Sequence, residues 1–262
     1  MPELPEVEAA ARALARAAVG KRIADVRLLH PALRRTVKAT SARTLRGRRI
    51  DRVDRRGKHQ LLTLDDQSVV HVHFRMTGDW IVGSAGDLLP RHARAVFDLT
   101  DGTRVTLADP RALATIAIYP AGTRPALPTL GPEATDPTLT PELLAHALRK
   151  RRLAIKVALL DQRVVAGLGN IYAAEALWHA GIDPAAPAAD LTLAQLGRLI
   201  EGMRRTLGDA ADDPGRYGRS ESEQRLNVYG RVGEPCRRCK GPIVRIVQGG
   251  RSTYHCAHCQ RS

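Results

Sequence analysis

The sequence predicts an α+β protein in which an antiparallel sheet domain is followed by a helical domain and a cysteine-rich ribbon. Apolar and polar residues alternate over short segments of the first half, whereas apolar residues recur at helical spacing after residue 141. All four cysteines lie near the C-terminus in two CxxC pairs. The length of 262 residues fits two modest domains or one large one, and 44% hydrophobic residues suffice for real cores.

The N-terminal stretch "PELPEVEAAARALARAAVG" predicts a helix. Pro5 suits a first helical turn, and Glu6 and Glu8 favour a helix N-terminus. Gly20 is placed to end the helix. None of this explains Pro2.

Strands are predicted for "HQLLTL", "SVVHVHF", "RAVFDLT" and "TRVTLAD". Asp101-Gly102 separates the last two, and Asp-Gly between alternating segments is typical of a hairpin turn. We therefore expect the first half to form an antiparallel sandwich or barrel.

A proline-rich segment separates the sheet from the helices. Residues 120–141 hold six of the 16 prolines and show no periodicity. Helices are predicted beyond it in "PELLAHALRKR", "IKVALLD", "IYAAEALWHAG" and "TLAQLGRLIEGMRRTLG". The predicted divisions are a sheet domain at 1–120, a linker at 121–141, a helical domain at 142–226 and a ribbon at 227–262.

The net charge of +14 is concentrated at the two ends of the chain. Residues 1–60 carry 16 basic and 6 acidic groups (+10), 61–226 carry 18 and 20 (−2), and 227–262 carry 7 and 1 (+6). This concentration of positive charge favours a nucleic-acid partner. Because nine aromatic residues are too few to stack a run of single-stranded bases, duplex is favoured over single strands. We find neither an export signal, nor an apolar run that reaches the ~18 residues of a membrane span, nor a membrane-binding amphipathic helix. The sequence therefore predicts a cytoplasmic protein without a membrane partner.

The cysteine pairs predict one structural zinc ion. Cys236 and Cys239 are separated by sixteen residues from Cys256 and Cys259, and each CxxC turn supplies two thiolates to a tetrahedral site. "PIVRIV" and "STYHC" predict a two-stranded ribbon that turns at Gly249-Gly250. Two disulfides or a redox CxxC are the alternatives, and His255 and His258 are possible substitute ligands.

The segment "GLGNIYAAEAL" predicts a helix start with Asn170 as its N-cap. Glycines before it leave backbone N–H groups for a phosphate, although a simple helix cap explains the same residues. The nearby basic residues suit either a solvated face or phosphate contacts; they are Arg149, Lys150, Arg151, Arg152 and Lys156. Together the two stretches favour a phosphate site.

Six segments, in this order, resemble the bacterial formamidopyrimidine-DNA glycosylases, which are related to endonuclease VIII. They are "PELPEVE", "GKHQLL", "HFRMTG", "ADPRALA", "GLGNIYAAEAL" and the cysteine ribbon, and they cover nearly the whole chain. The resemblance implies a β-sandwich with a leading helix, a helix-two-turn-helix domain and a zinc finger. It also implies a monomer that excises oxidised purines from damaged duplex DNA and then cleaves the strand by β,δ-elimination, at the nucleoid of a bacterium.

The resemblance implies catalytic roles for Pro2, Glu3, Lys58 and Arg251. Removal of Met1 frees the secondary amine of Pro2, and an α-amino group with a pKa of ~8 is partly neutral and nucleophilic near pH 7. Glu3 is the expected proton shuttle, Lys58 the lysine that contacts the target phosphate, and Arg251 the zinc-finger arginine that reaches the phosphate of the flipped nucleotide. Glu6 and Glu175 match acids that lie near the site in the family, and helix-terminus and structural roles explain these two residues equally well.

The family's remaining DNA contacts match Met76, His92, Arg111, Leu113, Arg152 and Asn170. Leu113 stands where the family has the Phe that helps to fill the gap left by the flipped base. The loop "GDAADDPGRYGRSESEQ" is shorter and more acidic than the family's capping loop. The preferred lesion therefore stays open among formamidopyrimidines, 8-oxoguanine and oxidised pyrimidines, although "PELPEVE" is the purine-branch form.

Two other classes of protein fit part of the sequence. A non-catalytic protein that binds damaged DNA would not need Pro2, Glu3 and Lys58, and all three are present. An RNA-processing zinc-ribbon protein fits the charge but leaves the N-terminus unexplained.

Overall fold

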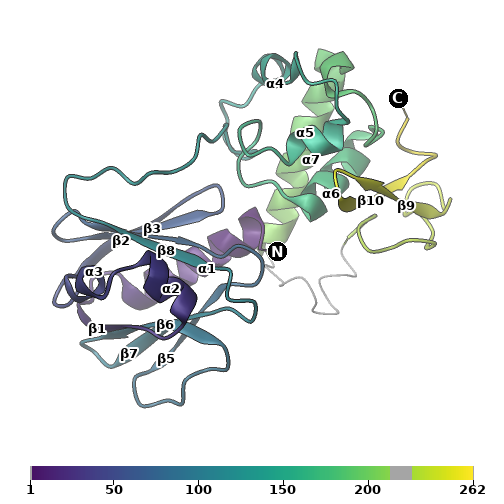
Figure 1. Cartoon of the computed structure of the whole chain (residues 1–262). Coiled ribbons are helices and arrows are strands. Elements are labelled where there is room, and N and C mark those ends of the chain that lie inside the picture. Colours follow the sequence, from purple (N-terminus) through teal and green to yellow (C-terminus); the bar gives the residue numbers. More distant parts are fainter. Residues whose placement is uncertain (1, 213–225, 262) are drawn as a thin grey trace. The chain divides into compact units, whose positions relative to one another are not determined.

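The computed structural model describes residues 2–212 and 226–261. The chain divides into two compact units (Figure 1). Apart from Glu3–Pro5, the first unit runs to Leu127, and the second comprises Glu3–Pro5 together with the chain from Pro128. The finer predicted divisions at residues 120, 141 and 226 stay a prediction.

The predicted N-terminal helix is confirmed as α1 (Leu4–Ala18). Pro5 lies in its first turn, where a missing N–H leaves no helical hydrogen bond unmade. Its buried positions Val7, Leu14 and Ala18 recur at helical spacing. Gly20 follows the helix with φ +83°, a conformation that favours glycine.

Two four-stranded antiparallel sheets form the first unit, so the structure selects a sandwich over a barrel. The first sheet has the order β1 (Ile23–Leu28), β6 (Ala93–Leu99), β7 (Thr103–Ala108) and β5 (Asp79–Ser84). The second has the order β2 (Ile50–Arg56), β3 (His59–Leu64), β4 (Val69–His73) and β8 (Thr115–Tyr119).

One hydrophobic cluster joins the two sheets of the sandwich. Leu62 and Val70 reach it from the second sheet, and Phe97 and Leu107 from the first. The Asp101-Gly102 hairpin is confirmed between β6 and β7. Two short helices that the sequence did not predict lie between β1 and β2, namely α2 (Pro31–Thr36) and α3 (Ala39–Arg43).

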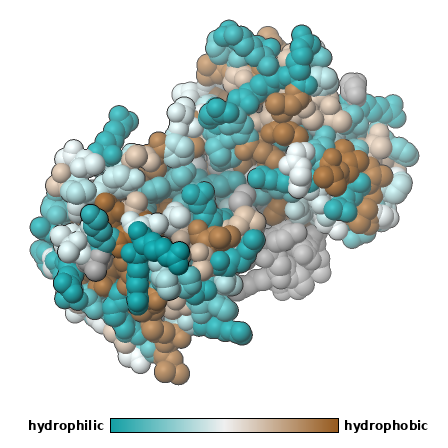
Figure 2. Space-filling model, in the orientation of Figure 1, coloured by the Kyte–Doolittle hydropathy of each residue, from teal (hydrophilic) through white to brown (hydrophobic). Residues whose placement is uncertain are grey.

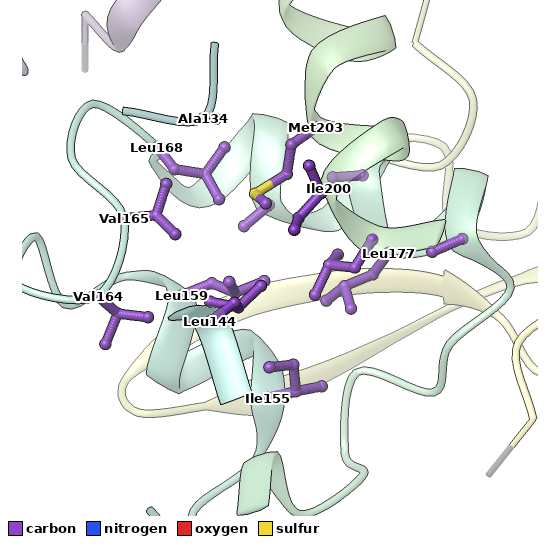
Figure 3. Close-up of a cluster of buried hydrophobic side chains, with 14 of the residues drawn as sticks. Ala134, Leu144, Ile155, Leu159, Val164, Val165, Leu168, Leu177, Ile200 and Met203 are labelled. Atoms are coloured by element: carbon purple, nitrogen blue, oxygen red, sulfur yellow. The ribbon is translucent and has the colours of Figure 1, made fainter. Parts of the chain in front are cut away.

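The second unit begins with the predicted helices. They are α4 (Pro141–Leu148), α5 (Ile155–Leu159), α6 (Asn170–Ala180) and α7 (Leu193–Asp212), with the 3₁₀ turn η1 (Ala188–Asp190) before α7. In the core of this unit, Leu144, Leu159, Leu177 and Ile200 converge from the four α-helices (Figure 3). The helix predicted over "PELLAHALRKR" is shorter than expected, because it ends at Leu148.

The C-terminal ribbon is confirmed as β9 (Ile243–Gln248) paired with β10 (Arg251–Cys256). Gly249 and Gly250 have φ values of +53° and +73°, as a tight hairpin with two left-handed residues requires. Hydrophilic residues predominate on the face shown in Figure 2, and hydrophobic residues reach the surface of both units. Within 2–212 and 226–261, none of the helices combines the length and apolar character needed to cross a membrane.

Candidate functional site

Glu3 is buried and its carboxylate is bound to the start of α6. Glu3 Oε1 accepts a hydrogen bond of 2.9 Å from the N–H of Ile171, and Oε2 accepts one of 3.3 Å from the N–H of Tyr172. These donors belong to the first turn of the helix, where N–H groups lack helical partners and a negative charge is stabilised. The carboxylate beside the half-buried Pro2 therefore has a fixed position.

The predicted role of Asn170 as N-cap is wrong. Gly169 is the N-cap residue, and α6 begins at Asn170 itself. A Cβ at Gly169 would collide with the carboxyl group of Glu3, so only glycine leaves room for that side chain. The N–H groups of Ile171 and Tyr172, which the sequence suggested for a phosphate, bind Glu3 instead.

The side chain of Asn170 connects three parts of the second unit. Its Oδ1 accepts a short hydrogen bond from Lys156 Nζ, while Nδ2 donates to Tyr229 Oη (3.2 Å) and to the carbonyl of Ser252 (3.0 Å). The amide is thereby joined to α5, to the segment before the ribbon and to the ribbon strand that begins with the exposed Arg251.

The sequence placed Lys156 among the basic residues of a solvated face or a phosphate site, and it did not show that the residue is buried. It stands in a basic run that resembles a solvated face, yet it is fully buried with 0% exposure. Burial and the charge of Arg251 lower the pKa of Lys156 to about 8. A buried lysine with a lowered pKa is typical of functional sites. Arg152, from the same run, is exposed.

Lys58 lies on the tight turn that joins β2 to β3 and is largely buried. The preceding Gly57 has φ +57°, and its carbonyl accepts a hydrogen bond of 2.9 Å from Arg55 Nη1. Arg55 Nε in turn donates to Glu8 of α1 over 2.5 Å. Arg55 therefore links the turn that carries Lys58 to α1.

Four further predicted DNA contacts lie in loops at strand ends of the first unit. Met76 and Leu113 are 38% and 43% exposed, Arg111 is exposed, and His92 is half-buried. Large apolar side chains left in solvent at loop tips are suited to a partner surface.

The four cysteines form the predicted metal centre. Their Sγ atoms all lie within 4.8 Å of one another, with 3.9 Å between Cys236 and Cys259 and 3.4 Å between Cys239 and Cys256. Zn–S bonds of about 2.3 Å in a tetrahedron imply S···S separations of about 3.8 Å, so the four thiols fit one zinc ion. The thiols are free, which excludes the disulfide alternative, and no histidine belongs to this group among the described residues.

The metal centre packs against α6. Trp178 Nε1 donates to Cys236 Sγ over 3.5 Å, and the guanidinium of Arg238 lies 3.9 Å from the centre of the Trp178 ring. Burial raises the pKa of Cys236, but hydrogen bonds from backbone N–H groups and from Trp178 outweigh it and lower the pKa to about 6. The ribbon and α6 therefore share one buried cluster.

The predicted site residues fall into two sets. Lys58, Met76, His92, Arg111 and Leu113 belong to the first unit with Pro2, and the others belong to the second. Glu175 is buried in α6 and accepts hydrogen bonds from the N–H groups of Asn227, Val228 and Tyr229, so it holds the chain before the ribbon. Most of the atypical loop predicted to cap the base, residues 213–225, lies outside the described residues.

Three family models match successive parts of the chain. The formamidopyrimidine-DNA glycosylase N-terminal domain matches residues 1–116, and the formamidopyrimidine-DNA glycosylase H2TH domain matches residues 130–218. The zinc finger found in FPG and IleRS matches residues 233–261.

Whole proteins resemble the chain over its full length. The formamidopyrimidine-DNA glycosylase of Geobacillus kaustophilus is 41% identical over 276 residues, covering 100% of both chains. The enzyme of the same name from Chloroflexus aggregans is 40% identical, covering 99% of this chain and 98% of its own.

Solved structures of this kind include complexes with DNA. Lactococcus lactis formamidopyrimidine-DNA glycosylase bound to DNA with an AP site has a TM-score of 0.90 at 30% identity, covering 99% of this chain and 100% of its own. A mutant of the same enzyme bound to DNA containing Fapy-dG has a TM-score of 0.91 at 31% identity, covering 100% of both.

Proposed function

The chain belongs to the formamidopyrimidine-DNA glycosylase family, and on that premise we propose that it is a bifunctional DNA glycosylase and AP lyase of base excision repair. It excises oxidised purines, foremost formamidopyrimidines, from duplex DNA and nicks the strand by β,δ-elimination. The observation that carries the proposal is the fixed carboxylate of Glu3, held by the first turn of α6 directly beside Pro2. A protein that only binds DNA has no need of this arrangement.

The proposed chemistry begins at the amine of Pro2 after removal of Met1. Its nitrogen attacks the anomeric carbon of the sugar, the bond to the base breaks, and the base leaves with a proton. Glu3 takes the proton that the Pro2 nitrogen loses as the new bond forms and passes it to the sugar ring oxygen as the ring opens to an iminium, while the departing base takes its proton from solvent. The iminium acidifies the neighbouring sugar carbon, so loss of that proton expels the 3′ phosphate and a second elimination expels the 5′ phosphate.

The other site residues bind and shape the DNA in this proposal. Lys58 and Arg251 contact the phosphates of the flipped nucleotide, to which Arg152 and Asn170 add contacts, while Met76, Arg111 and Leu113 occupy the space the base vacates. The four cysteines hold one structural zinc ion, which keeps Arg251 on a folded ribbon.

A borohydride experiment tests the proposed activity. Borohydride reduces an iminium to a stable amine, so the protein mixed with an abasic-site duplex and borohydride should yield an adduct that peptide mapping places on Pro2. A variant with one residue added before Pro2 has an amide there, whose delocalised lone pair is unreactive. It should bind duplex as the native protein does but neither trap nor cut.

Three results would contradict parts of the proposal. Absence of trapping across abasic, formamidopyrimidine and 8-oxoguanine duplexes would favour a non-catalytic binder of damaged DNA. Trapping through Lys58 would keep the lyase but change its nucleophile. Faster excision of oxidised pyrimidines than of purines would instead assign the chain the lesion preference of endonuclease VIII.

The proposal includes a monomeric enzyme that acts in the bacterial cytoplasm, at the nucleoid. Relatives such as the L. lactis enzyme are solved on damaged DNA, which supports damaged duplex as the partner. Sedimentation of the protein alone and with one lesion duplex tests the stoichiometry, for which we expect one chain per duplex.

A further inference from the structure

Asp109 is a fully buried carboxylate to which the proposed chemistry assigns no role. It follows β7 directly and has 0% exposure. Oδ2 accepts hydrogen bonds from the backbone N–H groups of Leu113 (2.6 Å) and Ala114 (2.7 Å). Oδ1 accepts one of 3.1 Å from the N–H of Arg111 and a short one from the hydroxyl of Thr77, the residue after Met76. One carboxylate thus joins the loops that carry Met76, Arg111 and Leu113.

The backbone of Asp109 fixes a third loop. Its N–H donates to the carbonyl of His92 over 3.0 Å. Its own carbonyl accepts a hydrogen bond of 2.6 Å from Arg94 Nε, and Arg94 Nη2 donates to the carbonyl of Pro110 over 3.2 Å. The predicted DNA contact His92 is therefore attached to the same residue.

Backbone strain is concentrated around this carboxylate. Five non-glycine residues among 2–212 and 226–261 have positive φ, and three of them lie in these loops. They are Arg75 (φ +57°) before Met76, His92 itself (φ +67°) and Ala112 (φ +53°) between Arg111 and Leu113. Side chains with a Cβ rarely adopt such conformations, which persist where the surroundings impose them and which gather at functional sites.

These loops are anchored at Asp109 and carry apolar side chains at their tips. Met76 and Leu113 are substantially exposed although both are large and apolar, whereas the carboxylate beneath them is buried. Burial raises the pKa of Asp109, but the hydrogen bonds from Thr77 and from three N–H groups outweigh it and hold the pKa below its usual range. Asp109 is thus ionised at neutral pH and accepts all four hydrogen bonds.

We propose that Asp109 is a positioning residue that holds Met76, Arg111 and Leu113 as one preassembled wedge for the gap left by a flipped base. The inference rests on the proposed function, since only an enzyme that everts a base needs such a wedge. A wedge that is ordered before binding loses little conformational freedom when it enters the duplex. Asp109 touches neither substrate nor reacting atoms in this role and acts through the loops.

Hydrogen exchange in the free protein tests the structural half of the proposal. Asp109→Asn replaces one accepting oxygen by a donor, which leaves the N–H groups on that side without an acceptor. Amide exchange should accelerate about tenfold or more on the side that loses its acceptor, either at Arg111 or at Leu113 and Ala114, while exchange inside β6 and β7 stays unchanged. Asp101→Asn makes the same chemical change at the turn between these strands. It should leave amide exchange at Arg111, Leu113 and Ala114, the wedge amides, at the native rate.

Single-turnover kinetics on two duplexes test the functional half. Excision of a formamidopyrimidine requires the base to leave the stack, whereas a preformed abasic site has no base to evert. With the enzyme well above its Kd for each duplex, so that weaker binding does not limit the rate, Asp109→Asn should slow excision about tenfold or more but keep borohydride trapping at the abasic site within about twofold of the native rate. Thr77→Val should also slow excision, by a smaller factor. Thr77→Ser keeps the hydroxyl and should excise at the native rate.

Each other outcome has a distinct meaning. Excision by Asp109→Asn at the native rate, or equal losses on both duplexes, would overturn the wedge role. If Asp109→Asn does not fold, the Thr77 pair decides, and Thr77→Val with native excision would overturn it. If the native protein neither excises nor traps, the proposed function fails. Unchanged exchange at the wedge amides of Asp109→Asn would separately refute the role of Asp109 in holding the loops.

Discussion

The carboxylate of Glu3 accepts a hydrogen bond of 2.9 Å from the backbone N–H of Ile171, 168 residues further along the chain. Its other oxygen binds the next N–H, that of Tyr172, at 3.3 Å. The N-terminal residue pair Pro2-Glu3 would otherwise be a frayed chain end, since the first residues of most domains are poorly ordered unless they are tied down. This attachment would hold the Pro2 amine in place for the nucleophilic role that we propose for it.

Gly169→Ala should disable the enzyme by displacing Glu3. The added Cβ would overlap the Glu3 carboxyl group, which is the side chain's fixed end, so either Glu3 or the start of α6 must move. We expect a loss of stability of about 1–3 kcal/mol, as is usual for overpacking, and a much larger loss of excision. Urea unfolding and single-turnover excision measure the two effects. Native excision rates in Gly169→Ala would show that the position of Glu3 is not critical.

Gly208→Ala is the matched control for this substitution. Gly208 lies within α7, and a Cβ there meets no atom within 4 Å. Alanine is favoured over glycine in a helix interior by about 1 kcal/mol, so the control should stabilise the protein and leave excision unchanged.

Removal of the metal should unfold the ribbon and change the fluorescence of Trp178. We expect one zinc ion per chain by metal analysis, because four free thiols share one site. In a Trp80→Phe background, Trp178 is the remaining tryptophan, and its N–H contacts Cys236 Sγ, so chelation should change its fluorescence. Cys256→Ser should lose the metal and bind duplex about tenfold more weakly, because the folding free energy of such a ribbon comes largely from its metal.

The sandwich should survive this loss of metal. Trp80 packs between Phe74 and Phe97 in the first unit, so in a Trp178→Phe background its fluorescence should not respond to chelation. A zinc content well below one per native chain, with thiols paired as disulfides, would refute the metal centre.

Lys156 should make stability depend on pH in alkaline solution. Its pKa is about 8 in the folded protein against 10.5 as the ordinary value, chiefly because of burial. Between these pH values the unfolded chain binds a proton that the folded chain does not, so the free energy of unfolding should rise with pH from about 8 to about 10.5. Lys156→Met should remove this part of the slope in urea unfolding at several pH values, and Lys150→Met, at an exposed lysine, should keep it. An identical slope in native protein and Lys156→Met would contradict the lowered pKa.

Leu113→Phe should tighten binding to an abasic-site duplex. Phenylalanine buries more area than leucine and stacks on bases, so a wedge with Phe fills the vacated space better. We expect the Kd for abasic duplex to fall about threefold to tenfold, with little change for undamaged duplex, and Leu113→Ala to act in the opposite direction. Unchanged or weaker binding of Leu113→Phe would count against Leu113 as part of the wedge.

Local patterns were sufficient for elements such as the β6–β7 hairpin and for the metal centre, but they did not reveal α2 and α3. The alternation around Asp101-Gly102 specified the β6–β7 hairpin, and the spacing of the cysteines specified a four-thiol site, because both depend on residues close together in the chain. Alternation alone did not distinguish a sandwich from a barrel, since that choice depends on how distant strands pair.

The sequence analysis misread Asn170 and missed the burial of Lys156, because the surroundings of both residues are formed by distant parts of the chain. Asn170 has a residue type that is common at N-caps and stands just before the apolar part of α6, yet Gly169 is the N-cap. The amide of Asn170 binds Lys156, Tyr229 and Ser252, which lie 14, 59 and 82 residues away in the sequence. Lys156 belongs to a run of charges, and the five-residue helix that buries it is too short to display a periodicity.

By itself the sequence determined which chemical groups this protein carries: a proline amine beside a carboxylate, four thiolates with zinc spacing and a basic surface for duplex DNA. Only the tertiary structure decided which of these groups are held in one position and which hydrogen bonds hold them. In the sequence, Asp109 is one of 27 acidic residues and Glu3 is an acid next to Pro2, with no sign of what holds either carboxylate. Their roles arise from hydrogen bonds to backbone N–H groups, and every residue except proline offers such a group, so no pattern of side chains records which ones a fold brings to a carboxylate.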